Sequence, residues 1–183
     1  MRFSYQTEQW LPYPLETVFA FFADPQNLPR LMPEWQKAKI DHANIVALPT
    51  TNEDGITAAA GVGSRVTLSF RPVPGVPSRL KWEAEISEFS RNSHFCDRQI
   101  RGPFAYWKHC HRVRSVPSRG IELTLLTDEV EYEPPFGMLG RLAHRLFLRR
   151  QIERSFAERQ ARLAEILANT YKPSQASASL RNG

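Results

Sequence analysis

The sequence has few cysteines and no long apolar stretch. Two cysteines in 183 residues are too few for a disulfide-stapled scaffold or for a zinc site built from cysteines. No apolar run approaches the roughly 18 residues that a membrane-spanning helix needs, and residues 1–6 form no apolar secretion segment. We therefore expect a soluble protein of the cytoplasm.

The motifs of several common enzyme classes are also missing. The sequence contains no Gly-x-Ser-x-Gly nucleophile motif and no phosphate-binding P-loop. Gly61 and Gly63 do not form a dinucleotide-binding fingerprint, because no third glycine, strand or helix is placed to complete it. We therefore expect no cofactor.

Apolar residues are abundant enough for one sizeable core. They make up 42% of the chain, and 11% of all residues are aromatic, so residues 1–171 are expected to form a single domain. The polar, low-complexity segment 172–183 is predicted to be a disordered tail, and the polar segment 48–61 is predicted to be a mobile loop.

The positive charge is concentrated in one segment. The net charge of the chain is +5, and residues 141–162 hold seven arginines against two glutamates, 7 − 2 = +5. A basic helix can bind nucleic acid or a membrane surface, although arginine stems more often cover apolar neighbours on a solvated face. Aromatic residues do not alternate regularly with the arginines as a stacking platform would need, since the segment holds only Phe147 and Phe156, so we expect no nucleic acid partner. Contact with a membrane or a protein partner stays open as an alternative.

The order of predicted elements begins with one strand and two short helices. A strand over 2–11 precedes a helix that Pro14 opens, and the Asp24–Pro25 cap starts a second helix that ends at about Met32. Six strands follow, in which apolar and polar residues alternate with a period of two. The last three of these strands are predicted at 93–101, 105–116 and 121–132.

A long helix is predicted over about 138–170. Its apolar residues recur at the helical spacing and are expected to face the sheet. Arg149 lies beside this stripe, and we expect its side chain to pass the stripe and reach water rather than a carboxylate in the interior. The stripe consists of Leu139, Leu142, Leu146, Ile152, Phe156, Leu163 and Leu167.

These elements define an α+β protein. A curved antiparallel sheet must cover its apolar face, and the C-terminal helix is the only element large enough to do so. One strand, two short helices, six strands and a long helix is the order of a helix-grip fold, in which the sheet wraps around the helix and leaves a central cavity.

Alternation assigns the side chains of the central strands to the two faces of the sheet. Arg98, Lys108 and Arg112 belong on the wet face. The residues expected on the cavity face are Phe95, Asp97, Gln99, Trp107, His109, His111, Val113, Thr124, Leu126, Asp128, Val130 and Tyr132.

The lengths of two turns predict which polar residues meet. The connection 102–104 places Asp97 opposite His109, and a four-residue turn at 117–120 places His109 opposite Asp128. Carboxylates on both sides of a histidine would orient its ring and raise its pKa, which suits a general base or a contact to a ligand. A structural network of paired buried polar groups is the plainer interpretation.

Two other readings concern metal ions and thiols. His109 and His111 share a face with the two aspartates, a set that can bind zinc or iron, but tryptophan and other bulky groups crowd this face and we expect no metal. The same register places Cys96 opposite Cys110 on the outer face. There we expect two free thiols rather than a disulfide.

Three segments together resemble a known family. They are 21–29 with Trp35, 97–104 with Trp107–His111, and 128–132 with 135–140. The chain resembles the START/Bet v 1-like superfamily, also described as SRPBCC or cyclase/dehydrase-like proteins, over about residues 1–170. The resemblance implies a cavity for a hydrophobic ligand. It does not imply one chemistry, because members include binding proteins, lipid carriers and polyketide cyclases.

The sequence therefore predicts a protein that binds a small, largely hydrophobic molecule in its cavity. One alternative is a cyclase- or dehydratase-type enzyme in which His109 is the base and Asp97 or Asp128 orients it. A second is an accessory protein that meets a membrane or a partner through the arginine-rich helix. The residues expected to contact the ligand are Trp35, Trp82, Phe95, Gln99, Trp107, His111 and Tyr132.

Overall fold

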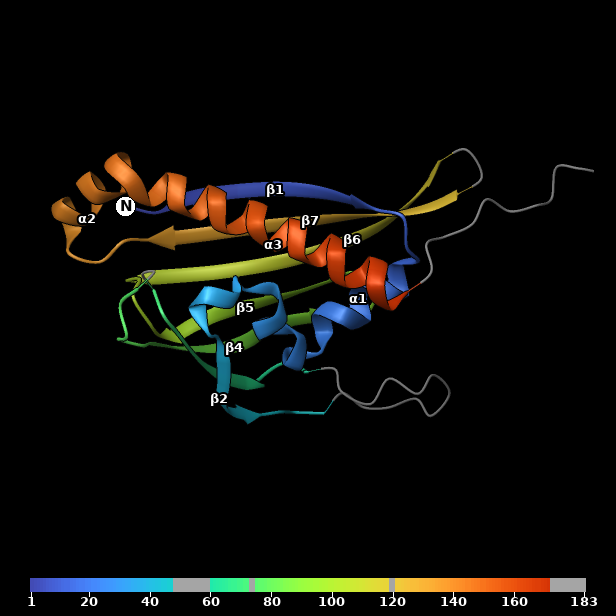
Figure 1. Ribbon diagram of the computed structural model, residues 1–183, viewed down its shortest axis with the longest axis horizontal. Coiled ribbons are helices and arrows are strands. Elements are labelled where there is room, and N and C mark those ends of the chain that lie inside the picture. Colours follow the sequence, from blue (N-terminus) through green and yellow to red (C-terminus); the bar gives the residue numbers. More distant parts are fainter. Residues whose placement is uncertain (48–59, 73–74, 119–120, 172–183) are drawn as a thin grey trace, which may run out of the picture.

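Seven antiparallel strands form one curved sheet (Figure 1). The computed structural model describes residues 1–47, 60–72, 75–118 and 121–171. Most of the predicted loop at 48–61 and the whole predicted tail lie outside these residues. The strands follow the order β1-β7-β6-β5-β4-β3-β2 across the sheet. They are β1 (Phe3–Leu11), β2 (Lys39–Asn44), β3 (Arg65–Phe70), β4 (Leu80–Ser90), β5 (His94–Arg101), β6 (Tyr106–Ser118) and β7 (Ile121–Glu133).

Short helices connect β1 to β2. Helix α1 (Leu15–Ala23) begins directly after Pro14 and buries most of its apolar side chains. The segment η1 (Pro25–Leu31) is a 3₁₀ helix, and the carboxylate of Asp24 caps it by accepting a hydrogen bond of 2.9 Å from the backbone of Gln26. Both helices confirm the prediction. A third, η2 (Glu34–Gln36), was not expected.

The long C-terminal helix lies across the concave face of the sheet (Figure 1). It consists of α2 (Gly137–Ala143), the π-helical turn η3 (His144–Leu148) and α3 (Arg149–Thr170). The second half of the predicted stripe is buried as expected: Ile152, Phe156, Leu163 and Leu167. The prediction is wrong for the first half, because Leu139, Leu142 and Leu146 are exposed.

The π turn explains this error. In an α-helix, four residues turn about 40° beyond a full rotation. If the helix were regular along its whole length, the buried stripe would therefore include Leu142 and Leu146. A π turn holds more residues per rotation, so it changes which residues before it face the sheet. Gly140 and His144 are therefore buried, and Leu142 and Leu146 point away from the sheet.

Two apolar clusters hold the helix on the sheet. One joins α1 to the end of α3, where Leu163 and Leu167 pack beside Phe19 and Leu126. The other surrounds Phe156 near the middle of the helix. Within the residues described, no helix is long and apolar enough to cross a membrane.

The register between β5 and β6 is the predicted one. Asp97 faces His109, and Cys96 faces Cys110. The two cysteines form a disulfide, with Cα atoms 4.0 Å apart, so the prediction of free thiols is wrong. Facing residues in the narrow, non-hydrogen-bonded pairs of an antiparallel ladder lie close enough for their sulfur atoms to bond.

The register between β6 and β7 differs from the prediction by two residues. Ser118 pairs with Ile121, so two residues connect these strands instead of four. Asp128 consequently faces His111, and His109 faces Val130. A shift of two keeps every side chain on its predicted face, because the period of a strand is two.

Candidate functional site

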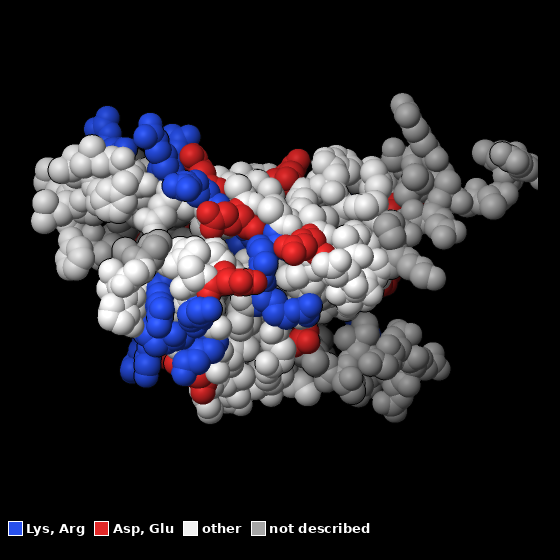
Figure 2. Space-filling view, viewed as in Figure 1, with Lys and Arg blue, Asp and Glu red and all other residues white. Residues whose placement is uncertain are grey.

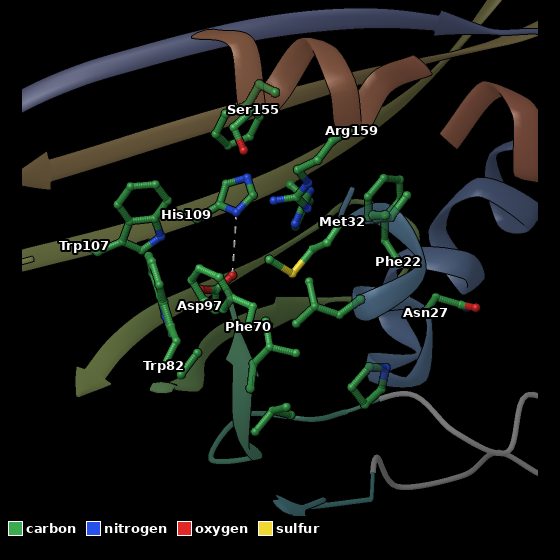
Figure 3. A pocket seen from close by; sticks show the side chains of 18 of the residues that line it. Phe22, Asn27, Met32, Phe70, Trp82, Asp97, Trp107, His109, Ser155 and Arg159 are labelled. Atoms are coloured by element: carbon green, nitrogen blue, oxygen red, sulfur yellow. Dashed lines mark ion pairs between the residues drawn. The ribbon is translucent and has the colours of Figure 1, made fainter. Parts of the chain in front are cut away.

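A cavity of about 450 Å³ lies between the sheet and the long helix. Strands β3 to β6 form its floor, α3 covers one side, and α1 and η1 close another (Figures 1 and 3). Most of the wall is apolar, as is usual for a site that binds a small organic molecule. Its apolar members include Phe21, Phe22, Leu31, Met32, Val66, Leu68, Trp82, Phe95, Phe104, Trp107, Ile152 and Phe156.

Polar groups of the wall converge on one part of the cavity. Asp97, His109 and His111 project from neighbouring strands, and Arg159 projects from α3 (Figure 3). Nδ1 of His109 lies 3.8 Å from Oδ1 of Asp97. Ser155 of α3 also lines this part of the wall.

Asp128 lies beneath both histidines. Its Oδ1 accepts a hydrogen bond of 2.9 Å from Nε2 of His109 and lies 2.7 Å from Nδ1 of His111. Because a carboxylate can only accept, the proton of a neutral His109 resides on Nε2, and Nδ1 keeps its lone pair on the side of Asp97. Asp128 thus orients the ring of His109 and lies in close contact with the ring of His111.

The environments of these groups separate their pKa values. Burial raises the pKa of Asp97 to about 6. Burial, assisted by the neighbouring His111, lowers the pKa of His109 to about 3 against the opposing effect of Asp128. Burial alone would raise the pKa of Asp128, but the charge of His111 and the contacts with both histidines hold it well below its usual range. At neutral pH, His109 is therefore an uncharged imidazole beside an ionised Asp128.

Four of the predicted ligand contacts lie in the wall, and three do not. Trp82, Phe95, Trp107 and His111 line the cavity. Trp35 is 39% exposed in η2 and is not part of the wall, although Pro33 and Gln36 on either side of it are.

The other two lie behind the wall. The amide of Gln99 closes the neighbouring turn, where its Nε2 donates a hydrogen bond of 2.7 Å to the carbonyl of Phe104. Tyr132 is fully buried, packs against Trp107, and its hydroxyl is 2.9 Å from Nε2 of His144. Neither side chain lines the cavity, and both pack behind residues that do.

Sequence reasoning missed Arg159. It considered Arg149, whose side chain is exposed and pairs with Glu153 at 3.0 Å, in agreement with the expectation that Arg149 does not reach the interior. Arg159 follows the buried Phe156 by three residues and precedes the buried Leu163 by four. That helical spacing could have placed it on the inner face.

One group of side chains has the composition of a metal site. Asp97, His109 and His111 each offer one ligand atom, and these atoms lie within 4.8 Å of one another. A tetrahedral zinc site would need ligand atoms about 3.4 Å apart, so the rings would have to rotate. Arg159 adds a positive charge to the same space, which opposes a cation. The absence of a metal remains a prediction, which metal analysis of the protein after dialysis against zinc would check.

The curved sheet, the long helix and the largely apolar cavity between them define a helix-grip protein. Residues 11–160 match the family described as polyketide cyclase / dehydrase and lipid transport, and the chain belongs to this family. A search of curated proteins finds no match.

Solved structures share the fold at low sequence identity. Protein CV1439 from Chromobacterium violaceum is 15% identical, with a TM-score of 0.62 over 89% of this chain and 95% of that one. TTHA0849 from Thermus thermophilus is 17% identical, with a TM-score of 0.61 over 91% and 99%. The major latex-like protein 151 of Panax ginseng is 11% identical, with a TM-score of 0.57 over 90% and 97%. These likenesses support the START/Bet v 1-like fold.

Proposed function

We propose that the protein binds a small, largely apolar molecule that carries one anionic group. The observation that supports this most directly is Arg159, whose guanidinium extends into a mostly apolar cavity beside His109 (Figure 3). Among the residues that the structure describes, no carboxylate lies within ion-pair distance of Arg159, and its guanidinium lies over the face of Phe156 at 5.3 Å. An arginine in such a place is suited to bind a carboxylate.

The remaining polar groups are compatible with a ligand of this kind. With a pKa of about 6, Asp97 is largely ionised at neutral pH, and proximity of a ligand carboxylate would favour its protonated form, which can donate a hydrogen bond. The neutral His109 can accept one at Nδ1. The aromatic wall would contact the apolar part of the molecule.

Binding can be tested with a matched pair of ligands. Calorimetric titration should show that dodecanoate binds at least tenfold more tightly than dodecanol, because only the former carries an anion. Arg159→Gln should remove this difference, whereas Arg150→Gln, an exposed position on the same helix, should keep it. Ala84→Trp should prevent both ligands from binding, since Ala84 lines the cavity.

The outcomes distinguish between the parts of the proposal. Equal affinity of the wild type for the acid and the alcohol would contradict an anionic ligand. Retained binding in a folded Ala84→Trp variant would contradict the cavity as the site. Native mass spectrometry of the purified protein would identify a bound molecule directly.

A second candidate is a cyclase- or dehydratase-type enzyme, which the separated pKa values favour. A pKa of about 3 makes His109 a weak base, whereas Asp97, at about 6, is suited to take a proton from a carbon next to a carbonyl group. His109 would then position Asp97 and the substrate oxygen. This candidate would be supported if the protein turned over a β-hydroxy carbonyl substrate and Asp97→Asn abolished the turnover while dodecanoate binding was preserved.

Residence in the cytoplasm also remains a proposal, which cell fractionation would test.

A further inference from the structure

The first three turns of the long helix, with the residue before them, expose an unusual amount of apolar surface. Six large apolar side chains between residues 136 and 147 are 55–84% exposed. Single exposed apolar residues are common, but a contiguous group of this size marks an interaction surface. We call these residues the apolar cap: Phe136, Met138, Leu139, Leu142, Leu146 and Phe147.

The fold itself turns the apolar cap outward. A β-carbon at Gly140 would clash with the carbonyl oxygen of Pro135, so this side of the helix lies directly against the chain. The ring of His144 stacks on Phe3 at 3.5 Å and contacts the hydroxyl of Tyr132 at 2.9 Å. Because Gly140 and His144 lie on the inner side of the helix, the side chains on its opposite side face outward.

The segment that carries the apolar cap is positively charged and has no carboxylate of its own between Glu133 and Glu153, the second of which pairs with Arg149 at 3.0 Å. Residues 134–152 include four arginines and neither aspartate nor glutamate. All four are exposed: Arg141, Arg145, Arg149 and Arg150. In Figure 2 this end of the molecule is an uncharged lobe, and lysine and arginine side chains border it along the helix.

This combination identifies the chemistry of the partner. We propose that residues 136–150 dock on the surface of an anionic phospholipid bilayer, with the apolar cap entering the headgroup region and the arginines contacting lipid phosphates. Amphipathic helices bind membranes through these two contributions. A second copy of the chain fits less well, because a symmetric contact would bring the arginines of both copies together.

The docking surface is continuous with the cavity. Leu148, Gln151, Ile152 and Ser155 follow the apolar cap on the same helix and line the cavity. Docking would therefore hold one wall of the cavity next to the lipid. Exchange of a ligand with the bilayer rests on the proposed function, whereas docking does not.

Sedimentation with sucrose-loaded vesicles tests the proposal. Vesicles of phosphatidylcholine with phosphatidylserine should bind the protein at least tenfold more tightly than vesicles of phosphatidylcholine alone. High salt should weaken this binding, since it screens charges at the membrane surface. Each arginine removed should weaken binding about fivefold, as expected for about 1 kcal/mol per basic residue.

Paired variants separate the two contributions. Leu142→Gln with Leu146→Gln should weaken binding to both kinds of vesicle. Arg141→Gln with Arg145→Gln should weaken binding to the phosphatidylserine vesicles about 25-fold and leave binding to phosphatidylcholine alone little changed. Trp10→Gln, an exposed apolar residue on β1, is the control for the first pair.

The control for the second pair, Arg112→Gln with Arg114→Gln, changes the net charge equally on the exposed side of β6. If this control weakens binding as much as the helix pair, the attraction is not local and the proposal is wrong.

Other results would also overturn docking. Equal binding to both kinds of vesicle, or none, contradicts it. A concentration-dependent dimer in light scattering that the leucine pair dissolves would instead assign the apolar cap to a second copy. Dodecanoate binding should survive in the leucine pair, so a failure of docking can be told apart from a failure of the cavity proposal.

Discussion

Asp128 forms its hydrogen bond with His109 although the two residues do not face each other across the sheet. Asp128 faces His111 in the ladder, and its Oδ1 reaches the next inward residue of β6 at 2.9 Å. One carboxylate thus contacts both histidines of the cavity floor. Asp97 approaches the opposite nitrogen of His109 at 3.8 Å, so the two aspartates occupy different environments around one ring.

The two aspartates should respond oppositely to neutralisation. Asp128→Asn is expected to lower the free energy of unfolding at pH 7 by about 1.5–3 kcal/mol, because it weakens the buried hydrogen bond that the charged carboxylate accepts from His109. Asp97→Asn should raise it by about 1–2 kcal/mol, because the buried carboxylate of Asp97 prefers to be protonated and keeps only part of its contact with water. Urea unfolding measures both. Equal destabilisation by the two variants would contradict this assignment.

The effect of Asp97→Asn should depend on pH. The pKa of Asp97 is raised to about 6 in the folded protein, so the folded state binds more protons than the unfolded state between about pH 4 and 6. The contribution of Asp97 to stability is therefore lost as the pH rises through 6. The gain from Asp97→Asn should be near zero at pH 4 and complete at pH 7. The exposed Glu8→Gln on β1 serves as control and should show no such trend.

The histidine acts in the opposite direction. The pKa of His109 is lowered to about 3 in the folded protein, so between about pH 3 and 6.5 the unfolded state holds the additional proton. Its contribution to stability is present above pH 6.5 and is lost as the pH falls. A titration of the histidine resonances by NMR should show one ring that stays neutral at pH 5. A normal titration of His109 would contradict the conclusion that burial outweighs the contact with Asp128.

Phe156 should be the most sensitive apolar position of the long helix. Its side chain is 3% exposed and packs against Tyr5 at a ring distance of 5.2 Å, so Phe156→Ala should cost about 3–5 kcal/mol. Leu146→Ala on the same helix should change the free energy of unfolding by less than about 0.5 kcal/mol, because Leu146 is exposed. Thermal and urea unfolding of the two variants test this difference.

The disulfide should contribute to stability through the unfolded chain. Cys96 and Cys110 are 14 residues apart, and closing a loop of that size restricts the unfolded state by about 3 kcal/mol. A reducing agent should lower the free energy of unfolding by about this amount, and the double variant Cys96→Ala, Cys110→Ala should no longer respond to it. A count of two free thiols in the untreated, unfolded protein would contradict the bond.

Gly140→Ala should destabilise the protein although alanine favours helices. In an exposed helix this change would stabilise by about 1 kcal/mol. Here the new methyl group would meet the carbonyl oxygen of Pro135, which is backbone and cannot move aside easily. A loss of stability in circular dichroism melting confirms the close contact, and a gain contradicts it.

Local patterns were sufficient to predict the sheet and its cavity face. Alternation of apolar and polar residues fixes which side chains of β5 and β6 share a face, because successive residues of a strand point to opposite sides. A tight connection then sets the register, and the connection predicted at 102–104 led to the observed pairing of Asp97 with His109. The next pairing failed because the number of residues in its turn could not be read from the sequence.

The sequence by itself determined the order of elements, the inward position of the Asp and His side chains, and the burial of the second half of the helix. These follow from periods of two and of about 3.6 residues, which depend on the chain alone. Only the tertiary structure decided that Leu142 and Leu146 are exposed, that the two cysteines bond, and that Arg159 enters the cavity. The π turn and the choice among several arginines depend on how the helix packs on the sheet. The bond between the cysteines depends on the local geometry of the β5–β6 ladder. The periods of two and of about 3.6 residues specify none of these.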